Sequence, residues 1–120
     1  MLENMSLDSC SEISTLAGKF NNLVLLDLAY TKIESISDVI APMLQRLILE
    51  DCSEIVTLSG HSNNLKILDL TDTPIKSLSD FWAPMLQTLN MIACSEIENL
   101  AGQFDNQILL ELSYSNIVNC

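Results

Sequence analysis

Residues 44–52 read Leu-Gln-Arg-Leu-Ile-Leu-Glu-Asp-Cys, and this stretch decides the fold. Leu47 and Leu49 are separated by one residue, so in an extended chain their side chains point to the same side. Residues 65–73 repeat this spacing as Leu-Lys-Ile-Leu-Asp-Leu-Thr-Asp-Thr, with every position shifted by 21. We therefore predict repeated units that each contain one short strand with one buried face.

The repeat extends over the whole chain. Cys-Ser-Glu-Ile begins at Cys10, Cys52 and Cys94, which are 42 residues apart both times, and a second type of unit ending in Thr31 or Thr73 lies halfway between. The units start at positions 2, 23, 44, 65, 86 and 107, and only the last lacks a leading Leu. Because the register is unbroken, we predict a single domain over residues 1–120 made of six 21-residue units.

The shared pattern, Leu-x-x-Leu-x-Leu-x-x-(Cys or Thr), recurs six times, with Met5, Met91 and Ser115 as substitutions. It resembles that of leucine-rich-repeat proteins. The alternation of a Cys-x-x-Ile type with a Thr-x-Ile type is similar to the repeat region of plant intracellular immune receptors, and short bacterial or protist repeats have about this length too. The resemblance implies an α/β fold, a right-handed solenoid with short parallel strands on a concave face.

The return path of each unit is expected to form the convex face from short helical turns or irregular crossovers, since only roughly 12 residues remain for it. Ser37-Asp38 and Ser79-Asp80 stand where a side-chain oxygen could cap a single helical turn. The aliphatic residues of the crossovers are expected to complete the core: Ile13, Leu16, Ile33, Ile36, Ile55, Leu58, Ile75, Leu78, Ile97, Leu100 and Ile117.

Composition narrows the classes of partner. The chain holds 16 acidic and 5 basic residues, a net charge of -11. This charge opposes binding to nucleic acid, which depends on Lys and Arg. It favours a protein partner with a basic surface, although solubility explains the same excess. No apolar run approaches the ~20 residues needed to span a bilayer, so no membrane segment and a cytoplasmic location are expected.

The cysteines and the histidine do not predict chemistry. Cys10, Cys52 and Cys94 occupy one position on alternate units, so neighbouring thiols are expected roughly 9 to 10 Å apart, too far for a disulfide or a shared zinc ion. We interpret them, with the Thr residues, as a ladder of small donors after each strand: Cys10, Thr31, Cys52, Thr73, Cys94 and Ser115. His61 is expected in a solvated crossover. We predict no metal, no cofactor and no enzymatic activity.

The candidate binding site is the outer side of the strands, where apolar and acidic residues are mixed. The alternative is that apolar residues there only favour strand formation. The residues expected to contact a partner on the concave face are Leu25, Asp27, Tyr30, Arg46, Ile48, Asp51, Ile67, Asp69, Asp72, Asn90, Leu109, Glu111 and Tyr114.

Three functions remain open. The first is a protein-protein interaction or ligand-sensing module that binds a partner on its concave acidic and apolar face. The second is a structural spacer or degenerate repeat remnant, and the third is the recruiting region of a larger enzyme. Because solenoids need polar caps at both ends and the first and last units carry none, we expect a fragment of a longer protein, or self-association through uncapped ends.

Overall fold

The computed structural model describes residues 2–78, 80–98 and 109–111, and within these ranges every element of regular structure is a strand. In chain order the strands are β1 Asn4–Ser6, β2 Gly18–Lys19, β3 Leu25–Asp27, β4 Val39–Ile40, β5 Arg46–Ile48, β6 Gly60–His61, β7 Ile67–Asp69, β8 Phe81–Trp82, β9 Thr88–Asn90 and β10 Leu109–Glu111.

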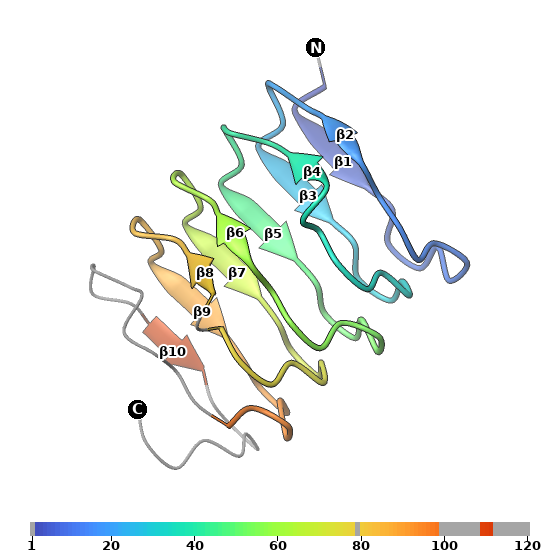
Figure 1. The fold of residues 1–120 in the computed structure, drawn as a ribbon, viewed down its shortest axis with the longest axis vertical. Coiled ribbons are helices and arrows are strands. Elements are labelled where there is room, and N and C mark those ends of the chain that lie inside the picture. Colours follow the sequence, from blue (N-terminus) through green and yellow to red (C-terminus); the bar gives the residue numbers. More distant parts are fainter. Residues whose placement is uncertain (1, 79, 99–108, 112–120) are drawn as a thin grey trace.

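Stacked coils make up the molecule (Figure 1). One parallel sheet of six strands has the order β1-β3-β5-β7-β9-β10, and two small parallel sheets, β2-β4 and β6-β8, lie on the crossover side. We number the coils from the N-terminus, so the first holds β1 and β2, the second β3 and β4, the third β5 and β6, the fourth β7 and β8, and the fifth β9. The predicted solenoid of stacked parallel strands is confirmed.

The register of the large sheet follows the sequence repeat. Leu26 lies opposite Met5 on one side and opposite Leu47 on the other, and each partner is 21 residues away. Because equal positions of successive coils stack on one another, each kind of side chain forms a column through the molecule. Residues at one position of the repeat therefore lie along one line on the surface or in the core.

The core is a set of aliphatic layers between the sheet and the crossovers. The central residue of β3, β5, β7 and β9 is buried, as are Ile33 and Ile55 in the crossovers. The residues two positions after these central residues are buried too: Leu28, Leu49, Leu70 and Met91. Of the predicted crossover core, Ile13, Leu16 and Ile36 are partly buried, and Leu100 and Ile117 lie outside the described residues. Layers of this kind supply most of the hydrophobic stabilisation at ~25 cal/mol per Å² of apolar area.

The predicted α/β character and helical turns are wrong for the part of the chain that the structure describes. No α-helix or 3₁₀ helix occurs there, and so none is long and apolar enough to cross a bilayer. At Ser37 and Asp38 the chain makes a turn in which the Val39 N–H donates to the Ile36 carbonyl at 3.0 Å. Val39 and Ile40 then pair with β2. The carbonyls of Asp38 and Ile40 thus accept hydrogen bonds from the first coil, so this part of the crossover is an extended strand and not a helical turn.

A backbone bend follows β1, β3, β5, β7 and β9 of the large sheet. The bend residue is Ser9, Tyr30, Asp51, Asp72 or Ala93, with φ between 56 and 65°. Non-glycine residues rarely adopt this left-handed conformation. Here the N–H of the bend residue donates to a carbonyl of the next coil, at 2.8 Å from Ser9 and 2.9 Å from Asp51. The stacking of the coils therefore holds the strained bend in place.

The donor ladder is confirmed for the buried positions. The Thr31 hydroxyl donates to the carbonyl oxygen of Leu28 at 2.8 Å, and the Cys52 thiol of the next coil donates to the same oxygen at 3.0 Å. The same arrangement recurs two coils later with Thr73, Cys94 and Leu70. Each Thr and Cys pair thus satisfies one carbonyl that the bend turns into the core. Cys10 in the first coil is exposed, and Ser115 lies outside the described residues.

Candidate protein-binding face

The outer side of the six-stranded sheet carries most of the predicted site residues. In each strand the first and third residues alternate with a central residue that points into the core, so they face outward. We call this surface the sheet face. Its predicted members Leu25, Asp27, Ile48, Ile67, Asp69 and Asn90 are partly exposed and Arg46 is exposed. Leu109 and Glu111 stand in β10, whose side chains are not described, and Tyr114 lies outside the described residues.

The bend residues form a second column beside the sheet face. Tyr30, Asp51 and Asp72 occupy the same bend in three successive coils, and Tyr30 is 49% exposed. Their left-handed backbone directs the side chains away from the core side of the chain. The structure therefore brings these three predicted residues into one line. Glu50, which precedes Asp51, joins them and was missing from the predicted site, although its place next to a bend residue was readable from the repeat.

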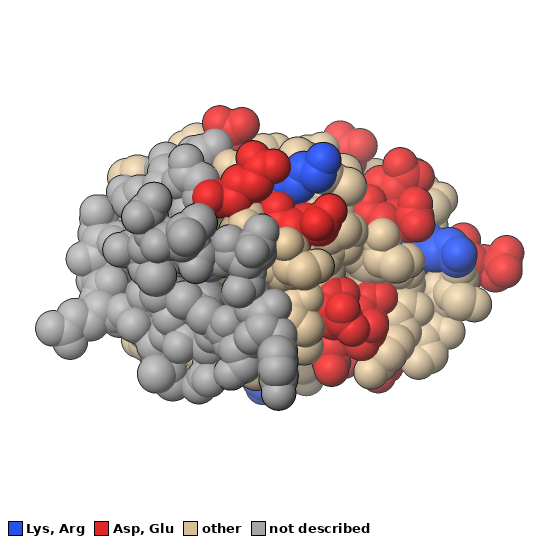
Figure 2. Space-filling model, turned by 90° about the horizontal axis from the view of Figure 1, so that it is seen from below, with Lys and Arg blue, Asp and Glu red and all other residues tan. Residues whose placement is uncertain are grey.

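Together these columns concentrate carboxylates at the edge of the sheet face. We define the acidic patch as Asp27, Glu50, Asp51, Asp69 and Asp72. Figure 2 shows acidic side chains in several groups across the surface, with few basic side chains between them. The acidic patch spans the second, third and fourth coils, so it is a property of the stack and not of one unit.

The surroundings of Glu50 disfavour the ionisation of its carboxyl group. Burial raises the pKa of Glu50, and repulsion from Asp69, Asp51 and Asp27 raises it further. All of these influences act in the same direction. The negative charge of Glu50 is therefore held in an unfavourable environment that a cation from outside would improve.

Asp51 and Tyr30 show the same effect in the bend column. Burial raises the pKa of Asp51 first, followed by repulsion from Asp72, while hydrogen bonding to Tyr30 lowers it. The pKa of Tyr30 is raised chiefly by the charges of Glu50 and Asp51. The phenol therefore remains protonated and can act as a donor at the surface.

Three polar residues of the sheet face have a structural role that sequence reasoning missed. The Asp27 carboxylate accepts a hydrogen bond from the Ala29 N–H at 3.0 Å, and Asp69 accepts one from the Thr71 N–H at 2.9 Å. Asn90 accepts one from the Ile92 N–H at 3.1 Å in the same way. An Asp or Asn side chain that bonds the backbone two residues on fixes the turn. These residues shape the bend, whatever else they contact.

Apolar side chains interrupt the acidic surface. Leu25, Ile48 and Ile67 are partly exposed on the sheet face, and Arg46 lies between Leu25 and Ile67 in the register of the sheet. Apolar area rimmed by charge is typical of interaction surfaces. The sheet face thus offers contact area as well as charge.

The described residues offer little for covalent chemistry. Burial raises the pKa of the Cys52 and Cys94 thiols, so they remain protonated and are poor nucleophiles. No group of three or more His, Cys, Asp or Glu residues in the described ranges could hold a metal ion. His61 is exposed on β6, where it lies opposite Trp82 of β8.

Comparisons of the chain with protein-family models, with curated proteins and with solved structures find no match.

Proposed function

We propose that the chain is a leucine-rich-repeat interaction module whose sheet face and bend column bind a basic surface of a partner protein. The observation that supports this most is the acidic patch, in which the pKa of Glu50 and that of Asp51 are both raised. A Lys or Arg side chain from a partner relieves this repulsion on contact, so association is favoured most where the carboxylates are closest.

The neighbouring surface supports contact beyond charge attraction. Tyr30, 49% exposed beside the acidic patch, provides an aromatic anchor of the kind that dominates protein interfaces. Leu25, Ile48 and Ile67 add apolar area that can be desolvated on binding. The net charge of -11 speeds the encounter with a basic partner at low salt.

A structural spacer is the second candidate, and one observation favours it. Asp27 and Asp69 bond the backbone of their own turns, so their presence on the sheet face is explained without a partner. Glu50 and Asp72 have no such role in the bend. Variants at these two residues therefore distinguish the partner-binding hypothesis from the spacer hypothesis. Recruitment by a larger enzyme has no observation of its own here and stays a prediction.

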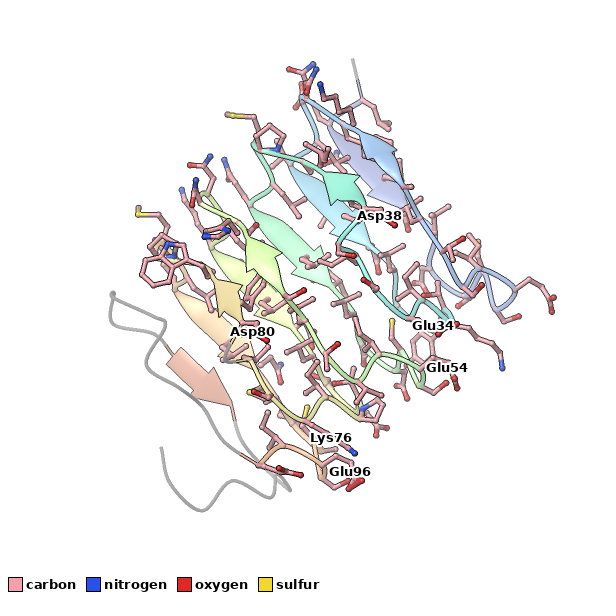
Figure 3. All side chains as sticks on the ribbon, in the orientation of Figure 1. Glu34, Asp38, Glu54, Lys76, Asp80 and Glu96 are labelled. Carbon is pink, nitrogen blue, oxygen red and sulfur yellow. The ribbon has the colours of Figure 1, made fainter. Side chains whose placement is uncertain are left out.

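The test compares two variants with equal changes of charge. In the first, Glu50→Gln, Asp51→Asn and Asp72→Asn neutralise three of the five carboxylates of the acidic patch and leave the turn-forming Asp27 and Asp69 unchanged. In the second, Glu34→Gln, Asp38→Asn and Glu54→Gln neutralise three exposed residues along the crossovers (Figure 3). Both variants and the native chain are immobilised and used to capture proteins from a cell lysate at low and moderate salt.

We expect a protein that the native chain and the crossover variant retain and the acidic-patch variant loses. Equal losses in both variants mean that total charge and not the acidic patch attracts the protein, which contradicts the proposal. Retention by all three leaves the spacer as the better explanation. Circular dichroism spectra of the three chains must agree for the comparison to hold.

A further inference from the structure

The crossover side of the solenoid has a break between the second and third coils. β4 pairs with β2, and β6 pairs with β8, but no hydrogen bond joins β4 to β6. The reason is local, because the Val39 N–H that would donate to the third coil is used in the turn to Ile36. Two strand edges therefore face each other across a gap, as the separation of the small sheets in Figure 1 shows.

A pocket of about 160 Å³ occupies this gap. Leu26, Leu44 and Phe81, which are at most 5% exposed, form its apolar part and belong to the core of the molecule. Its remaining lining comes from both edges: Ile36, Ser37, Val39, Ala41, Ser59, Gly60, His61 and Ser62. A second, more open depression of about 400 Å³, bounded by Pro42 and Met43, shares Val39, Ala41, His61 and Ser62 with this pocket. The pocket thus gives access from solvent to buried apolar side chains.

Comparison with the first coil explains the pocket. Phe20 and Ser62 occupy equal positions, 42 residues apart, and each backbone N–H donates to the crossover strand of the next coil at 2.8 Å. The Phe20 ring packs beside Gly18, only 3.2 Å from where a Cβ on Gly18 would lie. At the corresponding Gly60 nothing lies within 4 Å of that point. The pocket is therefore the space that an aromatic ring fills in the first coil.

We propose that this pocket binds a small aromatic molecule that carries one hydrogen-bonding group, with its ring in the place that Phe20 fills in the first coil. A cavity of roughly 150 Å³ lined by aliphatic and aromatic side chains accommodates one benzene ring. The apolar floor formed by Leu26, Leu44 and Phe81 supplies the favourable contact with the ring.

The walls supply the specificity for a polar substituent. The carbonyls of Asp38 and Ile40 accept hydrogen bonds from β2, so by the alternation of a strand the Val39 carbonyl and the Ala41 N–H face the gap. The hydroxyls of Ser59 and Ser62 line the same opening. A hydroxyl or amide group on the ring finds donors and acceptors there. This site lies on the crossover side and does not depend on the proposed partner surface.

The main test fills the pocket with the side chain that the first coil already uses. Phenol and toluene, which have rings of equal size, are titrated into ¹⁵N-labelled native chain and Ser62→Phe while amide chemical shifts are recorded. For the native chain we expect shifts centred on Val39, Ala41 and Gly60, with phenol binding in about the millimolar range and more tightly than toluene. In Ser62→Phe we expect these shifts to weaken at least tenfold and the melting temperature to rise.

A second pair of variants keeps the proposal testable if Ser62→Phe does not fold. Ser59→Leu places a bulky side chain at the pocket, and Ala17→Leu places the same side chain at the equal position of the first coil, away from it. We expect Ser59→Leu to weaken phenol binding and Ala17→Leu to leave it unchanged. Equal binding by both, or shifts of the native chain located elsewhere, overturns the proposal. If toluene binds more tightly than phenol, the polar walls do not favour a hydrogen-bonding group, and that part of the proposal is wrong.

Discussion

Neighbouring coils make two kinds of contact. Both include the large sheet, and they differ in whether the crossover strands also pair. Between the first and second coils, and again between the third and fourth, the crossover strands pair as β2-β4 and β6-β8. Between the second and third coils the crossovers do not pair, and the side chains of Thr31 and Cys52 share the Leu28 carbonyl inside the molecule. The sheet is common to both kinds of contact, whereas the crossover strands pair at two boundaries and do not pair at the boundary between them. At the boundary of the fourth and fifth coils the Glu98 N–H donates to the Lys76 carbonyl at 3.0 Å.

This difference between the contacts corresponds to the two types of unit in the sequence. A Cys-type coil donates backbone hydrogen bonds to the Thr-type coil that follows it, through Gly18 and Phe20 in the first pair. A Thr-type coil cannot continue this because its own turn uses the next donor, at Val39. Over the first four coils the crossover strands therefore join the coils in two pairs, and the pocket lies at the boundary between these pairs.

The largest expected effect concerns the large sheet, which both kinds of contact share. Leu47 and Leu68 are the buried central residues of β5 and β7. Leu47→Ala and Leu68→Ala should each lower the free energy of unfolding by about 2–5 kcal/mol, because each leaves a cavity in a close-packed layer. Urea denaturation followed by circular dichroism measures both. A loss under about 1 kcal/mol in either variant would show that the layers relax, which contradicts a core set by the sheet.

A smaller effect isolates the contact between the second and third coils. Thr31→Val or Cys52→Ala alone leaves one donor on the Leu28 carbonyl, whereas the double variant leaves none. The double variant should therefore lose about 1–3 kcal/mol more stability than the sum of the two single losses, since a buried carbonyl becomes unsatisfied.

The same urea experiments give this coupling as a double-mutant cycle. Simple additivity would mean that the two side chains do not serve one oxygen, and the alternation of contacts would lose its main support. Thr73→Val with Cys94→Ala provides a replicate at the boundary two coils later, where both side chains donate to Leu70 at 2.8 Å.

The smallest expected effect concerns pH. The pKa of Glu50 in the folded chain lies above its ordinary value of 4.5, mainly through burial and the nearby Asp69. Ionisation therefore costs the folded state more than the unfolded state. Stability is greatest while Glu50 is protonated and falls as pH rises from 4.5 through the higher folded value. Glu50→Gln should remove this fall and stabilise the chain at pH 7 by a few tenths of a kcal/mol, since solvent screens the charges.

Thermal unfolding between pH 4 and pH 8 measures this effect, with Glu54→Gln in an exposed crossover position as the matched control. An equal response of the two variants would mean that the charge of the whole chain and not the acidic patch sets the pH dependence.

The parts of the fold that a single physical cause determines could be predicted from the sequence. The 21-residue spacing and the alternating Leu residues predicted the sheet, its buried columns and the Thr and Cys donors, because burial and hydrogen bonding leave few other places for these side chains. The crossovers were predicted as short helical turns or irregular chain, and the helical alternative is wrong for the described residues. A turn at Ser37 and Asp38 is compatible with both a helix and a strand, and only pairing with β2 decides between them.

The candidate site was less readable for a different reason. The sequence showed that Asp27 and Asp69 face outward, but their bonds to the Ala29 and Thr71 amides depend on the exact bend. The exchange of Phe20 for Ser62 was visible in the aligned units. It becomes a pocket only because β4 and β6 do not pair, and that is a property of the assembled coils.

The pairing of the coils limits how such a chain can be lengthened or shortened. Removal of a single internal 21-residue unit would place two Cys-type or two Thr-type coils next to each other. Where two Thr-type coils meet, each would use the donor at the position of Val39 in its own turn. Their crossover edges would then not pair with each other. A duplication or a designed extension of two units preserves the alternation of contacts. A shortened or extended form of this chain should therefore lose or gain two coils at a time, so that the pairs joined through β2-β4 and β6-β8 stay intact.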